Sequence, residues 1–216
     1  MCSDPFLKQL PCARLAVLSL AMLVLPISES AGQAQWQKTV KVIAPVEKGI
    51  VTRALTDSVL AMVEAQDKRF RRAPQSDTTV TLTAIEDVLS EEGLALTSAT
   101  HVFITYRFTQ KSGRLQRDIL DLHFIYRPSA EQGEDIPILY LDLTKDGLYR
   151  KLLVEQGIPV RINEAAFRSF EEQIAFHNLQ DTATVVQVGN RIIRDAAQAA
   201  STKKRIMKIV RKLTYD

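Results

Sequence analysis

Two stretches in which apolar and polar residues alternate constrain the fold of this chain most strongly. His101–Phe108 reads HVFITYRF and Leu122–Pro128 reads LHFIYRP. Strict alternation is typical of half-buried β-strands, and two such runs separated by a polar segment predict an antiparallel hairpin. We therefore expect a hairpin over about residues 99–127, whose apolar residues face one core.

The register of this hairpin follows from its pattern. The apolar residues of both strands fall at even positions, so paired residue numbers must have an even sum if both strands face one core. A three-residue loop with Gly113 at its left-handed position meets this condition and places His101 directly opposite His123. Cross-strand histidines lie about 5 Å apart, close enough to share a zinc ion, and Asp121 is the nearest acidic third ligand. The alternative is that both histidines are hydrogen-bonded packing residues.

Alternation and helical periodicity predict the other elements. Trp36–Ala44 alternates and is rich in β-branched residues, and Ile136–Leu143 follows an acidic, Gly-containing connection, so both should be strands. Apolar residues recur at helical spacing from Val51 to Phe70, which predicts a first helix. Caps and apolar stripes predict further helices over 83–92, 146–156, 163–177 and 191–213, with a short extended run over 184–188.

The sequence also indicates which residues cap these helices and which ones face the core. Thr83 and Glu86 have the spacing of a capping box, and Asp146 and Asn163 are good caps for the next two helices. Phe167 begins the buried stripe of the 163–177 helix. Together the elements predict a single α+β domain, in which an antiparallel sheet built around the hairpin is covered by the helices near Ile50 and Phe167.

The first 34 residues have the plan of a secretory signal peptide. Lys8 and Arg14 precede an apolar run of eleven residues, and Gly32-Gln33-Ala34 offers small residues where a signal peptidase cleaves. The run is shorter than the ~20 residues of a membrane-spanning helix. We expect cleavage after Ala34, which leaves one domain over residues 35–216. The alternative is a leader retained as an uncleaved anchor.

The leader also bears on where the protein resides. Cys2 and Cys12 both lie in it, so the exported chain has neither a disulfide nor a thiolate metal site. The sequence contains no Asn-x-Ser/Thr acceptor for N-glycosylation. These features favour a secreted bacterial protein of the periplasm or cell envelope over a eukaryotic secreted protein.

Catalytic motifs are absent from the sequence. It contains no HExxH motif, no Gly-rich phosphate loop and no Gly-x-Ser-x-Gly elbow. The pairs Asp118/Asp121 and Asp142/Asp146 could act as acid and base, but Asp142 is expected in a strand and Asp146 at a helix cap. We expect a protein that is not an enzyme and that needs no cofactor.

The net positive charge of the chain is concentrated in the C-terminal helix. From Lys203 onward there are six basic residues and one acid, whereas the whole chain has a net charge of only +3. Such a helix could dock on an envelope protein or an anionic membrane surface, and export makes nucleic acid an unexpected partner. The plainer alternative is a terminal helix packed on the sheet with a solvated basic face. The candidate binding residues are Lys203, Lys204, Arg205, Lys208, Arg211 and Lys212.

These features favour an exported, non-enzymatic binding or assembly module of the cell envelope that uses its basic C-terminal helix. Two alternatives stay open. The first is a metal-assisted or carboxylate-based hydrolase built on His101, His123 and Asp121. The second is a carrier that holds a small apolar molecule between the sheet and the helices.

Overall fold

The computed structural model describes most of the chain after residue 35. Contacts between Cα atoms divide the chain into Met1–Gln33 and Ala34–Asp216, and every described residue belongs to the second unit. The predicted signal peptide, Gly113, Asp146 and Asn163 lie outside the described residues. The described ranges are 36–66, 68–111, 114–128, 134–145, 147–159, 167–179 and 181–215.

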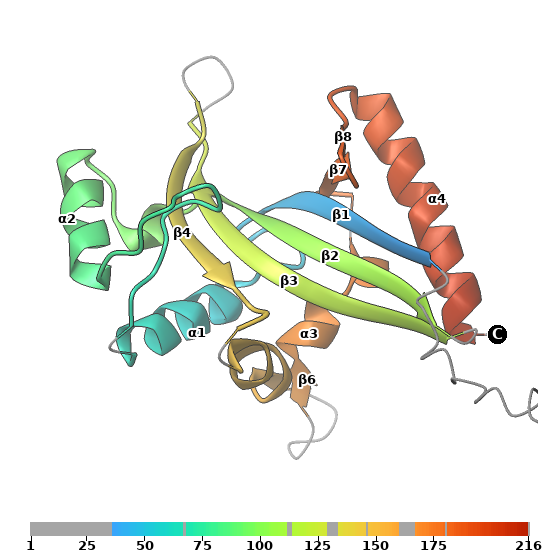
Figure 1. The fold of residues 1–216 in the computed structure, drawn as a ribbon, viewed down its shortest axis with the longest axis horizontal. Helices are drawn as coiled ribbons and strands as arrows, with labels where there is room; N and C mark the ends of the chain where they lie inside the picture. The colour runs from blue at the N-terminus through green and yellow to red at the C-terminus, as the bar shows by residue number, and fades with distance from the viewer. Residues whose placement is uncertain are drawn as a thin grey trace, which may run out of the picture. The chain divides into compact units, whose positions relative to one another are not determined.

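A six-stranded antiparallel sheet organises the domain (Figure 1) and confirms the predicted α+β class. The strand order is β4-β3-β2-β1-β7-β8, so β1 and β2 lie at the centre. The two predicted hairpin strands, the predicted strand at Ile136 and the predicted first strand at Trp36 are all present. The bounds are β1 Trp36–Pro45, β2 His101–Lys111, β3 Arg114–Tyr126, β4 Ile136–Asp142, β7 Thr184–Val188 and β8 Arg191–Ile192.

One face of the sheet, the inner face, forms the core. Alternate residues of the long strands point to this face and are almost completely buried, as the pattern predicts. Tyr106 donates a hydrogen bond of 2.6 Å to the carbonyl oxygen of Ile174, and Phe176 packs edge-on against the rings of Tyr106 and Phe108. The inner-face residues of β1 and β2 are Val40, Val42, Ala44, Val102, Ile104, Tyr106 and Phe108.

The predicted register of the hairpin is wrong. His101 pairs with Ile125 and His123 pairs with Phe103, so the two histidines are not opposite each other. The register shifts between Thr105 and Tyr106, where Leu120 has no partner of its own. This β-bulge turns Ile119, not Leu120, toward the core, and Ile119 is 1% exposed. Both Ile119 and Leu120 are apolar, so alternation alone did not reveal the bulge.

The first helix is shorter than predicted, and the second begins at a different residue. α1 spans Arg53–Glu64, and Phe70 lies beyond it in an extended segment that pairs with Val80. α2 spans Leu82–Glu91 and is capped by Thr81, whose hydroxyl accepts the amide of Ala84 at 3.3 Å. Thr83 therefore lies inside the helix and does not cap it.

The region after β4 differs most from the prediction. The helix expected over 146–156 is present over 148–154, where η2 (Arg150–Val154) is a π-helix, whereas the described part of the helix expected over 163–177 contains only a four-residue helix, α3 (Phe170–Gln173). Between them β5 (Gly157–Pro159) pairs with β6 (Phe167–Ser169), and η3 (Phe176–Asn178) follows α3. Pairing in β6 leaves Phe167 56% exposed, so Phe167 is not part of the core. Helical spacing predicted the buried Phe170 and Ile174 but not this strand.

The last helix, α4, spans Ala196–Tyr215 and lies along the side of the sheet that includes β1 and β7 (Figure 1). It begins five residues after the predicted start, because β8 folds back on β7 through Gly189, whose φ is +56°. The carboxylate of Asp195 caps it by accepting the amide of Gln198 at 2.6 Å. Ala199, Ile206 and Val210 are buried against the core. Within the described residues, no helix combines the length and apolar character needed to cross a membrane.

Candidate functional site

The predicted metal ligands lie on the outer face of the sheet, opposite the core. His101, His123 and Asp121 share this face, but in the observed register the Val102–Phe124 pair lies between the pairs that contain the two histidines. Among the described residues, no group of three histidine, cysteine or carboxylate side chains is spaced to hold a metal ion. His177, the third histidine, contacts Arg117 at 2.9 Å and comes from η3. The fold therefore gives these residues no metal-binding geometry.

His123 is instead a packing residue. It is only 8% exposed, stacks on Phe103 with ring centroids 5.8 Å apart, and meets the edge of Tyr140 at 6.1 Å. Burial, aided by the positive charge of Lys41, lowers the pKa of His123 to about 4. Its imidazole is therefore neutral at pH 7.

Two charged residues near His123, Asp121 and Arg71, have partners on the outer face, whereas the Nε2 atom of His123 is buried without a hydrogen-bond partner among the described residues. Thr105 donates a hydrogen bond of 2.8 Å to Asp121, whose pKa burial nevertheless raises. The guanidinium of Arg71 lies 4.8 Å from the centre of the Tyr140 ring and 3.7 Å from the carboxylate of Asp142. The hollow beside Tyr140 and Asp142 has a volume of only about 140 Å³ and is not lined by His123 or Asp121.

On α4 the six predicted binding residues separate into two kinds. Lys203 is 8% exposed, and its Nζ donates a hydrogen bond of 2.8 Å to the carbonyl oxygen of Ala183. Burial lowers the pKa of Lys203, and the nearby carboxylate of Asp181 opposes that shift. Lys203 thus fastens α4 to the segment before β7 and does not belong to the exposed set that the sequence predicted.

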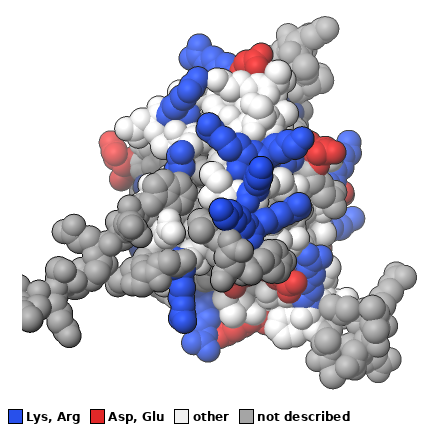
Figure 2. All heavy atoms as spheres, turned by 90° about the vertical axis from the view of Figure 1, so that its right-hand side faces the viewer, with Lys and Arg blue, Asp and Glu red and all other residues white. Residues whose placement is uncertain are grey.

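The other five cations form what we call the basic side of α4. All five are exposed, and none forms a salt bridge with any residue in the described part of the chain. Ile209 lies among them and is 41% exposed. Figure 2 views this side of the molecule and shows Lys and Arg side chains gathered together, with few acidic side chains between them. The five residues are Lys204, Arg205, Lys208, Arg211 and Lys212.

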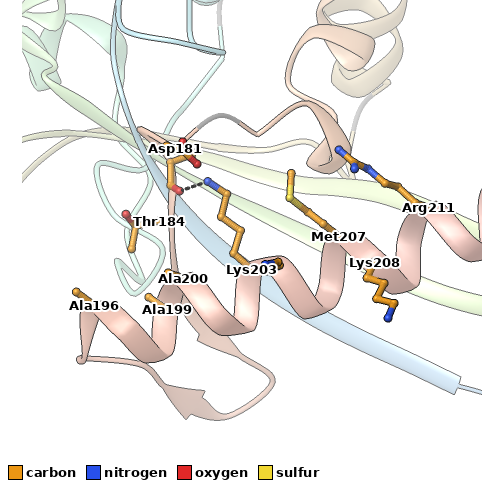
Figure 3. A pocket seen from close by; sticks show the side chains of 11 residues that line it. Asp181, Thr184, Ala196, Ala199, Ala200, Lys203, Met207, Lys208 and Arg211 are labelled. Atoms are coloured by element: carbon orange, nitrogen blue, oxygen red, sulfur yellow. Dashed lines mark hydrogen bonds between the residues drawn. The ribbon is translucent and has the colours of Figure 1, made fainter.

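A groove of about 810 Å³ runs beside this basic side, between α4 and residues 181–184. Figure 3 shows Lys203, Met207 and Arg211 extending from α4 toward the same side, with Lys203 hydrogen-bonded to the 181–184 segment. Alanines line the start of its α4 wall and basic residues the end, and the facing wall includes Asp181 and Thr184. The lining is Asp181, Ala183, Thr184, Ala196, Ala199, Ala200, Lys203, Lys204, Met207, Lys208 and Arg211.

The sequence predicted the basic rim of this groove but not its apolar lining. Ala196, Ala199 and Ala200 lie in an alanine-rich run at the start of α4, which was a visible signal of a helix surface without large side chains. The opposite wall comes from residues before β7, and no local pattern places them beside α4. Comparisons of the chain with known protein families and with curated proteins find no match.

Proposed function

We propose that this chain is an exported, non-enzymatic binding module of the bacterial cell envelope that attaches to an anionic membrane surface through the basic side of α4. The signal-peptide pattern of the first 34 residues supports export. The observation that carries the membrane attachment is the exposure of five cations on one helix, without ion pairs among the described residues.

The electrostatics of α4 favour a membrane surface as the partner. Each Lys or Arg near an anionic bilayer contributes about 1 kcal/mol of attraction. The opposite side of the helix is buried in the core, so the cations are held on a fixed scaffold and lose little freedom on binding. Ile209, exposed among the cations, can enter the interface between headgroups and acyl chains.

Removing three of the cations tests the proposal. The variant Lys204→Gln/Lys208→Gln/Arg211→Gln changes only exposed side chains, whereas deleting α4 would also remove the buried Ile206 and Val210. We expect its affinity for vesicles of phosphatidylglycerol and phosphatidylcholine to fall by roughly 100-fold, since three charges contribute about 3 kcal/mol. Co-flotation with vesicles measures this affinity.

The matched control removes the same net charge elsewhere. Lys48→Gln/Lys145→Gln/Lys151→Gln replaces three exposed lysines outside α4, and its affinity should fall only slightly because long-range charge effects are screened. Phosphatidylcholine vesicles should bind none of the proteins. Equal losses in the two triple variants, or no binding of the unchanged protein to anionic vesicles, would overturn the proposal.

A further inference from the structure

The groove beside the basic side of α4 has the size and polarity of a ligand site. Protein interiors are usually packed to the density of organic crystals, and pockets for small molecules measure about 300–1,000 Å³. The groove, at about 810 Å³, falls within that range. It is hollow because four alanines line it, and their methyl groups leave space that larger apolar residues would fill. The four are Ala183, Ala196, Ala199 and Ala200.

The groove has alanines at the start of its α4 wall and cations at the end of that wall, while Asp181 and Thr184 lie on the facing wall. Along α4 its lining runs from Ala196 to Arg211, which corresponds to about 22 Å at 1.5 Å per residue. Ala196 and Ala200 lie in the first part, Met207 lies beyond them, and Lys208 and Arg211 follow at the far end. An apolar floor that leads to two cations is complementary to a molecule with an apolar chain and an anionic head.

Lys203 is buried in the groove wall and has partners there. Lys203 gives its hydrogen bond to the carbonyl oxygen of Ala183, and the carboxylate of Asp181 lies near enough to raise the pKa of Lys203. The exposed carboxylate of Asp181 therefore offsets only part of the effect of burial on Lys203. The positive charge without a carboxylate partner in the described residues lies with Lys204, Lys208 and Arg211.

We propose that the groove binds one acyl chain of an anionic phospholipid, with the chain along the alanines and the headgroup phosphate beside Arg211, whose side chain extends to the same side of α4 as Met207 (Figure 3). This inference rests on the proposed membrane attachment and names its ligand. One leaflet of the hydrocarbon core of a bilayer is about 15 Å thick, so the groove is long enough for a chain and its headgroup. Burial of methylenes adds affinity that a purely electrostatic contact lacks.

A substitution that fills the groove distinguishes lipid binding in the groove from attachment to the membrane by charge alone. Ala200→Phe places a ring among the alanines at an exposed helix position and keeps every cation. The matched control is Ala197→Phe, which adds the same ring at an exposed position of α4 outside the groove lining. Thermal melts of both variants should coincide with that of the unchanged protein, since neither position is buried.

The measurement is isothermal titration of each protein with a short-chain, water-soluble phosphatidylglycerol below its micelle-forming concentration. We expect Ala200→Phe to bind this lipid at least roughly tenfold more weakly than the unchanged protein, because the ring displaces methylenes from the groove. Ala197→Phe should bind it normally, and the same lipid with a phosphatidylcholine head should bind poorly to all three.

The outcomes distinguish the two proposals. If Ala200→Phe binds the soluble lipid as tightly as the unchanged protein, the groove inference is wrong even when anionic vesicles still bind. If the unchanged protein binds anionic vesicles but not the soluble lipid, the groove inference is again overturned and electrostatic attachment remains. Failure of the unchanged protein to bind anionic vesicles overturns the proposed function itself.

Discussion

The outer face of the sheet and the basic side of α4 carry similar kinds of residues in opposite states. Around His123 the histidine is neutral, Asp121 is hydrogen-bonded and Arg71 contacts a carboxylate and an aromatic ring. On α4 the five cations are exposed and have no ion pairs with described residues. The difference teaches that ionisable residues near His123 serve packing and hydrogen bonding, whereas those on α4 remain exposed to solvent.

The hollows beside the two regions also differ in volume. The hollow at the edge of the outer face measures about 140 Å³, whereas the groove beside α4 measures about 810 Å³. Aromatic rings fill the first region, and alanines leave the second open. At α4 a ligand therefore finds a groove lined by exposed cations, whereas His123 is buried between aromatic rings.

The largest predicted effect tests whether α4 is a fixed scaffold for its cations. Ile206, one residue after Arg205, is 5% exposed, and Ile206→Ala should lower the free energy of unfolding by about 3 kcal/mol through the cavity that it leaves. Ile209→Ala, at a position that is 41% exposed, should cost less than about 1 kcal/mol. Urea unfolding measures both, and equal losses would contradict the placement of α4.

The pH dependence of stability tests the outer face. The pKa of His123 is about 4 in the fold and 6.5 ordinarily, so between these values the unfolded chain binds a proton that the folded chain does not. The free energy of unfolding should therefore fall by about 3 kcal/mol as the pH falls from 6.5 to 4. His101 and His177, whose pKa values burial also lowers, act in the same direction. Asp121, with a raised pKa, opposes them.

A substitution of His123 tests whether this residue causes the pH dependence of stability. His123→Phe keeps a flat ring between Phe103 and Tyr140 and removes the titrating group. Urea unfolding across pH 6.5 to 4 should show a clearly flatter profile for this variant, since the other two histidines are more exposed. A profile as steep as that of the unchanged protein would mean that His123 is not the buried neutral imidazole described above.

The two kinds of lysine on α4 should respond differently to the same change. Lys203→Met removes the hydrogen bond to the carbonyl of Ala183 and should cost about 2 kcal/mol of stability, while vesicle binding stays near its original strength. Lys204→Met should leave stability unchanged and weaken binding to anionic vesicles by several-fold. Thermal melts measure the stability of both variants, and co-flotation measures their binding to vesicles. A stable Lys203→Met variant with weakened binding, or a destabilised Lys204→Met variant with normal binding, would contradict the roles given to the two lysines.

The spacing of residues explains why part of α4 could be predicted and part could not. Ala199, Lys203, Ile206 and Val210 recur at steps of four, three and four, so the burial of Lys203 was visible in its spacing although its charge suggested exposure. The strands were predicted because alternation is local. The bulge was not, because Ile119 and Leu120 are equally apolar and only the paired strand decides which of them faces the core.

The groove could not be predicted because it depends on contacts between distant segments. Residues 181–184 meet α4 only through the pairing of β7 with β1 and the turn at Gly189. The same limit explains the short α3, since residues 167–169 pair with β5 where the sequence predicted a helix. A Cβ at Gly157 would lie 2.1 Å from the carbonyl oxygen of Arg168, so this approach requires glycine.

The smallest predicted effect concerns one hydrogen bond of the outer face. Thr105→Val removes the donor to Asp121 and should lower the free energy of unfolding at pH 7 by about 1.5 kcal/mol. The pKa of Asp121, already raised by burial, should rise further, since the lost bond favoured the carboxylate. Carboxyl NMR titration follows this shift, and an unchanged or lowered pKa would show that the bond does not form.

Amide hydrogen exchange with and without anionic vesicles tests most directly which of the two regions binds. The account predicts that phosphatidylglycerol vesicles slow exchange in residues 181–184 and 196–211, while the exchange of residues 101–105 and 121–125 is unchanged. Phosphatidylcholine vesicles should have no effect on either region. Protection of the strand residues around His123, with none on α4, would contradict the assignment of the binding surface.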